Sequence, residues 1–191
     1  MRDLFFFPLA AVVIAGIIYF ALNAGDEIET LTEADILREG YVMTGADFDS
    51  LTASPGTNFI LPSTEAGGTN YAIFSAQAPQ DGRASIGIFA TLGPEFESAF
   101  AGRKIEITIN ARRGQERPSD MFLIGYYTLN AGASGWQTFS LSDNFQDHSF
   151  TFTPGRPEGM SEIDYLGIWP APEGENKTME VNRITIKAVN L

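Results

Sequence analysis

The chain has 191 residues, a formal net charge of −12 and no cysteine. An acidic surface is repelled by phosphate backbones, so nucleic acid is excluded as a partner. The absence of cysteine excludes disulfides, thiolate metal sites and thiol catalysis.

Residues 4–22 are an uncharged apolar stretch at the start of the chain. Nineteen helical residues at about 1.5 Å each span roughly 30 Å, the thickness of a hydrocarbon core. A cleaved signal peptide is the alternative, but it usually has a more basic start, a shorter apolar core and a small residue at −3. Here a cut after Ala24 would leave Leu22 at −3. The sequence therefore predicts a transmembrane anchor over residues 1–22.

The charges that flank this stretch predict its orientation. Arg2 precedes it, whereas Asp26, Glu27 and Glu29 follow it. The positive-inside tendency places the N-terminus in the cytoplasm and the rest of the chain outside. We therefore expect a bacterial inner-membrane protein with its domain in the periplasm.

One face of the expected anchor carries small residues. Ala11 and Ala15 form a small-xxx-small pair, with Gly16 beside it. Such pairs allow a second helix to approach closely. They predict helix packing against integral membrane partners.

Residues 23–40 read as a connector with a short helix, which Thr32 begins as N-cap and Gly40 ends. From Tyr41 onward apolar residues alternate with polar ones, which is typical of strands. Turn-forming clusters separate the expected strands. We expect an all-β domain over residues 41–191, an antiparallel jelly-roll sandwich of about nine strands with no helix between them. The expected strands are residues 58–61, 71–76, 84–92, 103–112, 121–129, 137–141, 149–153, 165–169 and 179–188.

Four motifs in order carry a family resemblance over residues 41–191. They are FAGRKIEITINARR at 100–113, WQTFSL at 136–141 followed by FQDHSFTF at 145–152, DYLGIW at 164–169, and MEVNRITI at 179–186. Together with the GADFD start at 45–49, this pattern resembles galactose-binding-like jelly-roll domains, which include many carbohydrate-binding modules. In those domains an Asp stands more often at the position that Asn182 occupies here.

The resemblance implies two kinds of site. Related domains often hold a structural Ca²⁺ with carboxylates and backbone carbonyls, and Asp47, Asp49 and Glu180 lie in the matching regions. They also bind sugars on exposed aromatic rings. The candidate ligand-facing aromatics are Tyr126, Trp136 and Trp169; since Tyr126 and Tyr127 are neighbours on a strand, one of them must point outward.

Catalytic motifs are missing from the sequence. Its one histidine, His148, reads as a surface strand residue, and neither a G-x-S-x-G nor a phosphate-binding loop occurs. We therefore expect a protein that is not an enzyme and has no cofactor other than the candidate Ca²⁺.

Two functional interpretations remain open. The favoured one is a non-catalytic, single-pass accessory subunit of a larger membrane complex, because a connector of under twenty residues keeps the domain near the membrane. The alternative is a membrane-tethered carbohydrate-binding module that binds a glycan.

Overall fold

The computed structural model describes residues 31–62, 70–82 and 85–189. The predicted anchor and its packing residues Ala11, Ala15 and Gly16 lie outside the described residues. Within the described part, no helix is both long and apolar enough to cross a bilayer.

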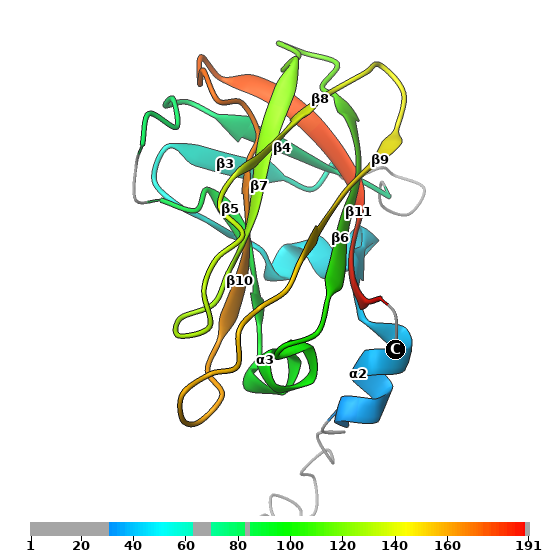
Figure 1. Cartoon of the computed structure of the whole chain (residues 1–191). Coiled ribbons are helices and arrows are strands. Elements are labelled where there is room, and N and C mark those ends of the chain that lie inside the picture. The colour runs from blue at the N-terminus through cyan, green and yellow to red at the C-terminus, as the bar shows by residue number, and fades with distance from the viewer. Residues whose placement is uncertain (1–30, 63–69, 83–84, 190–191) are drawn as a thin grey trace, which may run out of the picture. The chain divides into compact units, whose positions relative to one another are not determined.

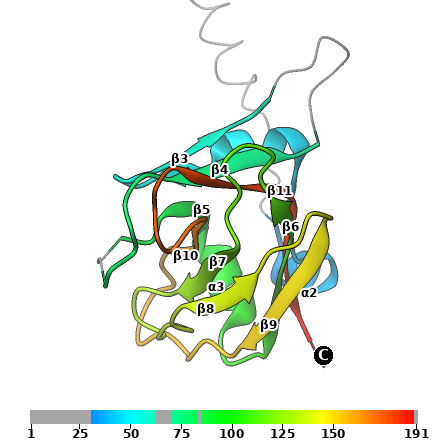
Figure 2. The ribbon, with the colours of Figure 1, turned by 90° about the horizontal axis from the view of Figure 1, so that it is seen from above.

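The described chain folds into two antiparallel β-sheets that pack face to face (Figures 1 and 2). Its helices are α2 (Glu33–Glu39), the 3₁₀ helix η1 (Gly45–Ser50) and α3 (Pro94–Phe100). Its strands are β1 (Tyr41–Thr44), β2 (Thr52–Ala53), β3 (Thr57–Ile60), β4 (Ala72–Ala76), β5 (Ile88–Leu92), β6 (Ile105–Arg113), β7 (Met121–Tyr127), β8 (Gln137–Ser140), β9 (Gln146–Phe152), β10 (Asp164–Trp169) and β11 (Lys177–Ala188).

The first sheet has the order β3-β4-β11-β6-β9, and the second has the order β2-β5-β10-β7-β8. In the first sheet, β1 also pairs with β11, beyond the segment of β11 that pairs with β4. The predicted all-β antiparallel sandwich is confirmed, with eleven strands in the described residues. The two strands absent from the prediction are β1, with four residues, and β2, with two.

Strands β6 and β11 form the centre of the first sheet. They pair from Met179 opposite Arg113 to Ala188 opposite Ile105. Along β6, Ile105, Ile107 and Ile109 are fully buried, because alternate side chains of a strand point to one face. The strand predicted at residues 103–112 is therefore confirmed.

The helices differ in how well the sequence predicted them. Helix α2 begins where expected, with Thr32 accepting a hydrogen bond from the Asp35 N–H at 3.2 Å, and it ends at Gly40 with φ of 74°. The expectation of no helix between strands is wrong at η1, which lies between β1 and β2, and at α3, which lies between β5 and β6. In α3, Pro94 occupies the first turn, and Phe96, Ala99 and Phe100 are buried. With seven residues, about two turns, α3 is too short for its three apolar residues to establish a helical period.

The core fills the space between the sheets. Its large, fully buried rings include Phe48 of η1, Phe74 of the first sheet, Phe100 of α3, and Phe122 and Tyr126 of the second sheet. His148 also points inward from β9, with its ring centroid 5.3 Å from that of Phe122 and 5.7 Å from that of Phe139. The structure thus corrects the surface position expected for His148, whose pKa burial lowers.

We predict that Ile107→Ala lowers the free energy of unfolding by about 2–5 kcal/mol, because it removes buried methyl groups and leaves a cavity. Its neighbour Glu106 is exposed on the opposite face of β6, so Glu106→Ala should change stability by less than about 0.5 kcal/mol. Chemical denaturation of both variants measures the difference. Equal losses would contradict the inward orientation of Ile107.

Candidate ligand-binding groove

The outer face of the first sheet is polar where β4, β11 and β6 lie side by side. On β4 and β11 the buried residues Phe74, Met179 and Val181 point inward. Their neighbours Ile73 and Glu180 therefore point outward. These outward positions, together with the loops around them, form the candidate site.

An ion pair lies at the centre of this face. Arg112 of β6 donates from Nε to Glu180 Oε2 at 2.7 Å, and its Nη2 lies 2.6 Å from the same oxygen. The Glu180 side chain is only 2% exposed. A buried carboxylate is costly unless it is paired and hydrogen-bonded, so Arg112 and Glu180 depend on each other.

Two aromatic rings flank the guanidinium of Arg112. It lies 4.5 Å from the ring centroid of Phe145 and 5.8 Å from that of Tyr71, and the two rings are 6.2 Å apart. Cations are attracted to the faces of aromatic rings, which holds Arg112 in one orientation. The four residues form a fixed unit that combines donors, acceptors and ring surface; we call Tyr71, Arg112, Phe145 and Glu180 the central cluster.

Three hollows lie on this face; the first two are lined by members of the central cluster, and the third is lined by Asn70, which precedes Tyr71 in the chain. The first, of about 280 Å³, is lined by Ile60, Tyr71, Ile73, Gln115, Glu116, Thr178 and Glu180. The second, of about 290 Å³, shares Gln115 with it and is lined by Arg112, Arg113, Gly114, Pro118 and Asp143 as well. The third, of about 340 Å³, is lined by Thr44, Gly45, Asn70, Asn182 and Arg183. Because neighbouring hollows share Gln115 or are lined by consecutive residues, we treat them as one groove.

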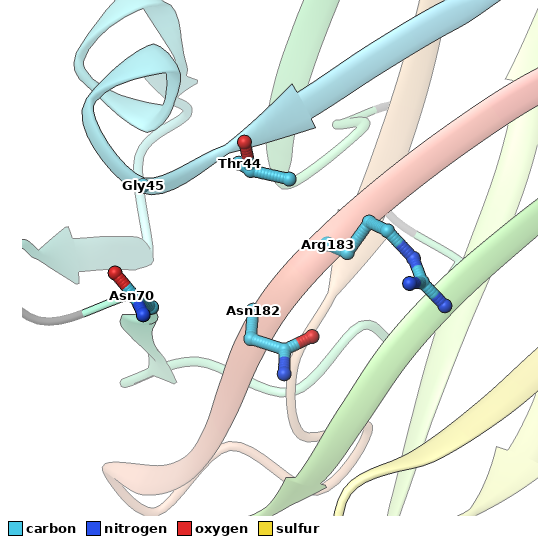
Figure 3. Close-up of a pocket in the computed structure, with 5 residues that line it drawn as sticks. All are labelled: Thr44, Gly45, Asn70, Asn182 and Arg183. Atoms are coloured by element: carbon cyan, nitrogen blue, oxygen red, sulfur yellow. The ribbon is translucent and has the colours of Figure 1, made fainter.

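A β-bulge on β11 shapes the third hollow. The pairing register with β6 shifts between Val181 and Arg183, so that one extra residue is accommodated. Val181 and Ile184 are both buried, and the two residues between them both face outward. Figure 3 shows Asn182 beside this hollow and Arg183 extending over β6.

The charged side chains of this face are paired with one another. Arg183 lies 3.0 Å from Asp147 Oδ1, which also accepts a hydrogen bond from Asn110 at 2.6 Å. Arg113 lies 2.7 Å from Asp120. The groove therefore offers hydrogen-bonding groups without a large unbalanced charge.

The structure places the three predicted aromatics outside the groove, on the second sheet. Tyr126 does not face a ligand as predicted, because it is fully buried and its hydroxyl group donates to Asp164 Oδ2 at 2.5 Å. Trp169 is also fully buried, in a small cluster with Ala76 and Ala171. Trp136 is half-buried, with its ring 5.5 Å from that of Tyr127, which is the outward-facing ring of the tyrosine pair.

The predicted calcium ligands are not gathered in one place. Asp47 caps η1 by accepting a hydrogen bond from the Thr44 N–H at 2.9 Å, and Asp49 is exposed. Glu180 is paired with Arg112 in the central cluster. Among the described residues, no three His, Asp or Glu side chains could together hold a metal ion. The proposed set of Asp47, Asp49 and Glu180 therefore does not fit one calcium site.

Most residues of the groove could not be predicted from the sequence. Tyr71, Phe145 and Asn70 lie at strand ends or in loops, where the alternating pattern gives no orientation. A usable signal existed at Glu180, a carboxylate between the apolar residues Met179 and Val181. Such a residue has to face solvent or a cationic partner, but its partner Arg112 is 68 positions away in the chain.

Comparisons with known proteins concern the fold. No protein-family model and no curated protein matches the chain. A solved family 4 carbohydrate-binding module is 17% identical, covering 70% of this chain and 78% of its own, with a TM-score of 0.46. The family 22 xylan-binding domain of Paenibacillus barcinonensis Xyn10C is 10% identical over 74% of this chain and 87% of its own, with a TM-score of 0.49.

A second family 22 module, the C-terminal one of Clostridium thermocellum Xyn10B, is 14% identical. It covers 78% of this chain and 92% of its own, with a TM-score of 0.47. The sandwich is thus similar to carbohydrate-binding modules. At these identities and TM-scores no ligand is carried over from them.

Asp164, the first residue of β10, has its carboxyl group in an unusual environment. It is fully buried, and burial raises its pKa from 3.8 to about 6, with the nearby Glu97 carboxylate adding to the rise. Hydrogen bonding from Tyr126 opposes this shift. A carboxyl group whose pKa is raised on folding stabilises the fold at low pH, and that contribution is lost as the pH rises through the folded pKa.

We predict that Asp164→Asn reduces the loss of stability between about pH 4 and pH 7, by roughly 1–3 kcal/mol. The amide is uncharged and still accepts a hydrogen bond from Tyr126. Denaturation midpoints across this pH range, compared with the exposed-site control Asp49→Asn, measure the effect. An unchanged pH profile in Asp164→Asn would show that the buried carboxyl group does not titrate there.

Proposed function

We propose that the chain is a glycan-binding module that holds an extended saccharide in the groove on the outer face of the first sheet. The observation that carries this proposal is the set of three hollows on this face. Several hollows along one face suit a chain of several linked units better than one compact ligand.

The chemistry of the lining residues supports a saccharide. Sugar hydroxyl groups both donate and accept hydrogen bonds, and Asn70, Asn182 and Gln115 do the same through their side-chain amides. Tyr71 lines the first hollow and offers an aromatic surface for the apolar face of a sugar ring. The few oriented polar groups beside apolar surface are typical of small-molecule sites.

The central cluster makes binding more plausible than hydrolysis. Hydrolysis of a glycosidic bond usually needs one carboxylic acid and one free carboxylate on opposite sides of the bond. Glu180 is held by Arg112 through two contacts of 2.6 and 2.7 Å, which fix its position. Its role in this proposal is to orient the guanidinium, not to transfer a proton.

The location of the module is part of the same proposal. The predicted anchor over residues 1–22 would tether the sandwich to the inner membrane, with the groove in the periplasm. The earlier interpretation as a subunit of a membrane complex depends on Ala11, Ala15 and Gly16, which lie outside the described residues. It stays a prediction.

We predict that Tyr71→Ala and Asn182→Ala each weaken glycan binding by roughly 3- to 10-fold, since each removes one stacking surface or one to two hydrogen bonds. Affinity electrophoresis against a panel of soluble polysaccharides identifies a ligand, and calorimetry then measures the affinities.

Trp136→Ala is the matched control, because it removes a half-buried ring from the second sheet and leaves the groove intact. Thermal unfolding establishes that each variant is folded. Binding that survives both groove substitutions and disappears in Trp136→Ala would place the site on the other sheet. Failure of the folded protein to bind any polysaccharide would overturn the proposed function.

A further inference from the structure

Apolar side chains protrude from one end of the sandwich. Among the described residues, the two most exposed large apolar side chains are Met160, at 90%, and Leu129, at 65%. Ile163 is 40% exposed in the same loop as Met160. Isolated exposed apolar residues are common on proteins, so these three indicate a contact surface only if they lie close together.

Strand pairing places these three residues at the same end. Leu129 follows β7, and Met160 and Ile163 precede β10; the end of β7 and the start of β10 are neighbours, with Tyr165 opposite Tyr127. The two loops also contact each other, since the Gly155 N–H donates to the Ala131 carbonyl at 2.8 Å. The apolar tips therefore belong to one surface.

The loop that carries Met160 is fastened to α3. The Glu162 N–H donates to the buried carboxylate of Glu97, and the hydroxyl groups of Ser98 and Ser161 are 2.7 Å apart. Both contacts hold the segment between Met160 and Ile163 against α3. The exposure of these side chains is thus built into the fold.

The chain enters the domain at this same end. Helix α2 leads directly into β1, whose first residue Tyr41 lies opposite Ile186 near the end of β11. Glu33 of α2 is 2.9 Å from Arg103, which follows α3. Figure 1 shows α2, α3 and the loop before β10 together at one end of the sandwich.

The distance to the expected anchor is short. Nine residues, 23–31, separate the apolar stretch at residues 4–22 from Thr32. Fully extended, they reach about 30 Å. An anchor in the bilayer would therefore hold the α2 end of the sandwich within reach of the lipid surface.

We propose that this end of the sandwich rests on the membrane, with Leu129, Met160 and Ile163 inserted at the boundary between headgroups and acyl chains. Apolar side chains of peripheral surfaces enter this boundary to about 5–10 Å. The acidic residues Glu158 and Glu162 flank the tips, so we expect shallow insertion and a preference for zwitterionic lipid over anionic lipid.

In this orientation, one end of the groove points away from the membrane. Gln115 and Pro118, which line it, belong to the turn between β6 and β7, at the end opposite the apolar tips. Membrane docking would therefore leave that end of the groove facing away from the lipid. The proposal does not depend on what the groove binds.

The test uses the full chain reconstituted in phosphatidylcholine vesicles. Because the protein has no cysteine, Met160→Cys and Ile163→Cys each give one site for a nitroxide label. Met121→Cys is the matched control, since Met121 is 39% exposed, close to the 40% of Ile163, and begins β7 at the opposite end. Electron paramagnetic resonance compares collisions with oxygen, which concentrates in lipid, and with a water-soluble nickel chelate.

We expect the ratio of oxygen to nickel collisions at positions 160 and 163 to be roughly threefold or more above that at position 121, as for side chains in the lipid boundary. Equal ratios at all three positions would overturn the proposal. Protection from both reagents at 160 and 163 would also overturn it, because a protein partner or a second copy would then cover the tips. If the chain does not float with the vesicles, it is not anchored in the bilayer, and the proposal is overturned as well.

Discussion

The pairing of β6 with β11 is the constraint on which the rest of the structure depends. These two strands stay in register over most of their length, and their alternation divides the residues between two environments. Ile105, Ile107 and Ile109 enter the core, while Arg112 and Glu180 meet on the opposite face. Core and groove are thus two faces of the same strand pair, and a slip of one residue in register would move every side chain of the shifted strand to the other face.

The groove combines this regular pairing with one local irregularity. The bulge between Val181 and Arg183 lets two consecutive residues face outward, which widens the polar surface beside Asn70 and Thr44. Bulges frequently redirect side chains toward a site, at the cost of one unpaired backbone position. Ion pairs and flanking rings then hold the long side chains in place.

The two ends of the sandwich differ in chemistry. One end carries α2, α3 and the apolar tips of two loops, and beneath it lie the buried carboxyl groups Glu97 and Asp164. The other end carries the turns that line the groove. The proposed membrane contact and the proposed glycan site would therefore lie apart, so that neither would block the other.

The sequence by itself determined the fold class and most strands, because period-two alternation and turn-forming clusters are local properties of the chain. It predicted the helix that Thr32 begins for the same reason, since an N-cap acts over three residues. Only the tertiary structure decided which aromatic residues face outward, that Glu180 pairs with Arg112, and that Asp47, Asp49 and Glu180 lie apart. Those outcomes depend on contacts between residues distant in the chain and on the register of β11, which no local pattern specifies. The transmembrane anchor over residues 1–22 remains a prediction from composition and length alone.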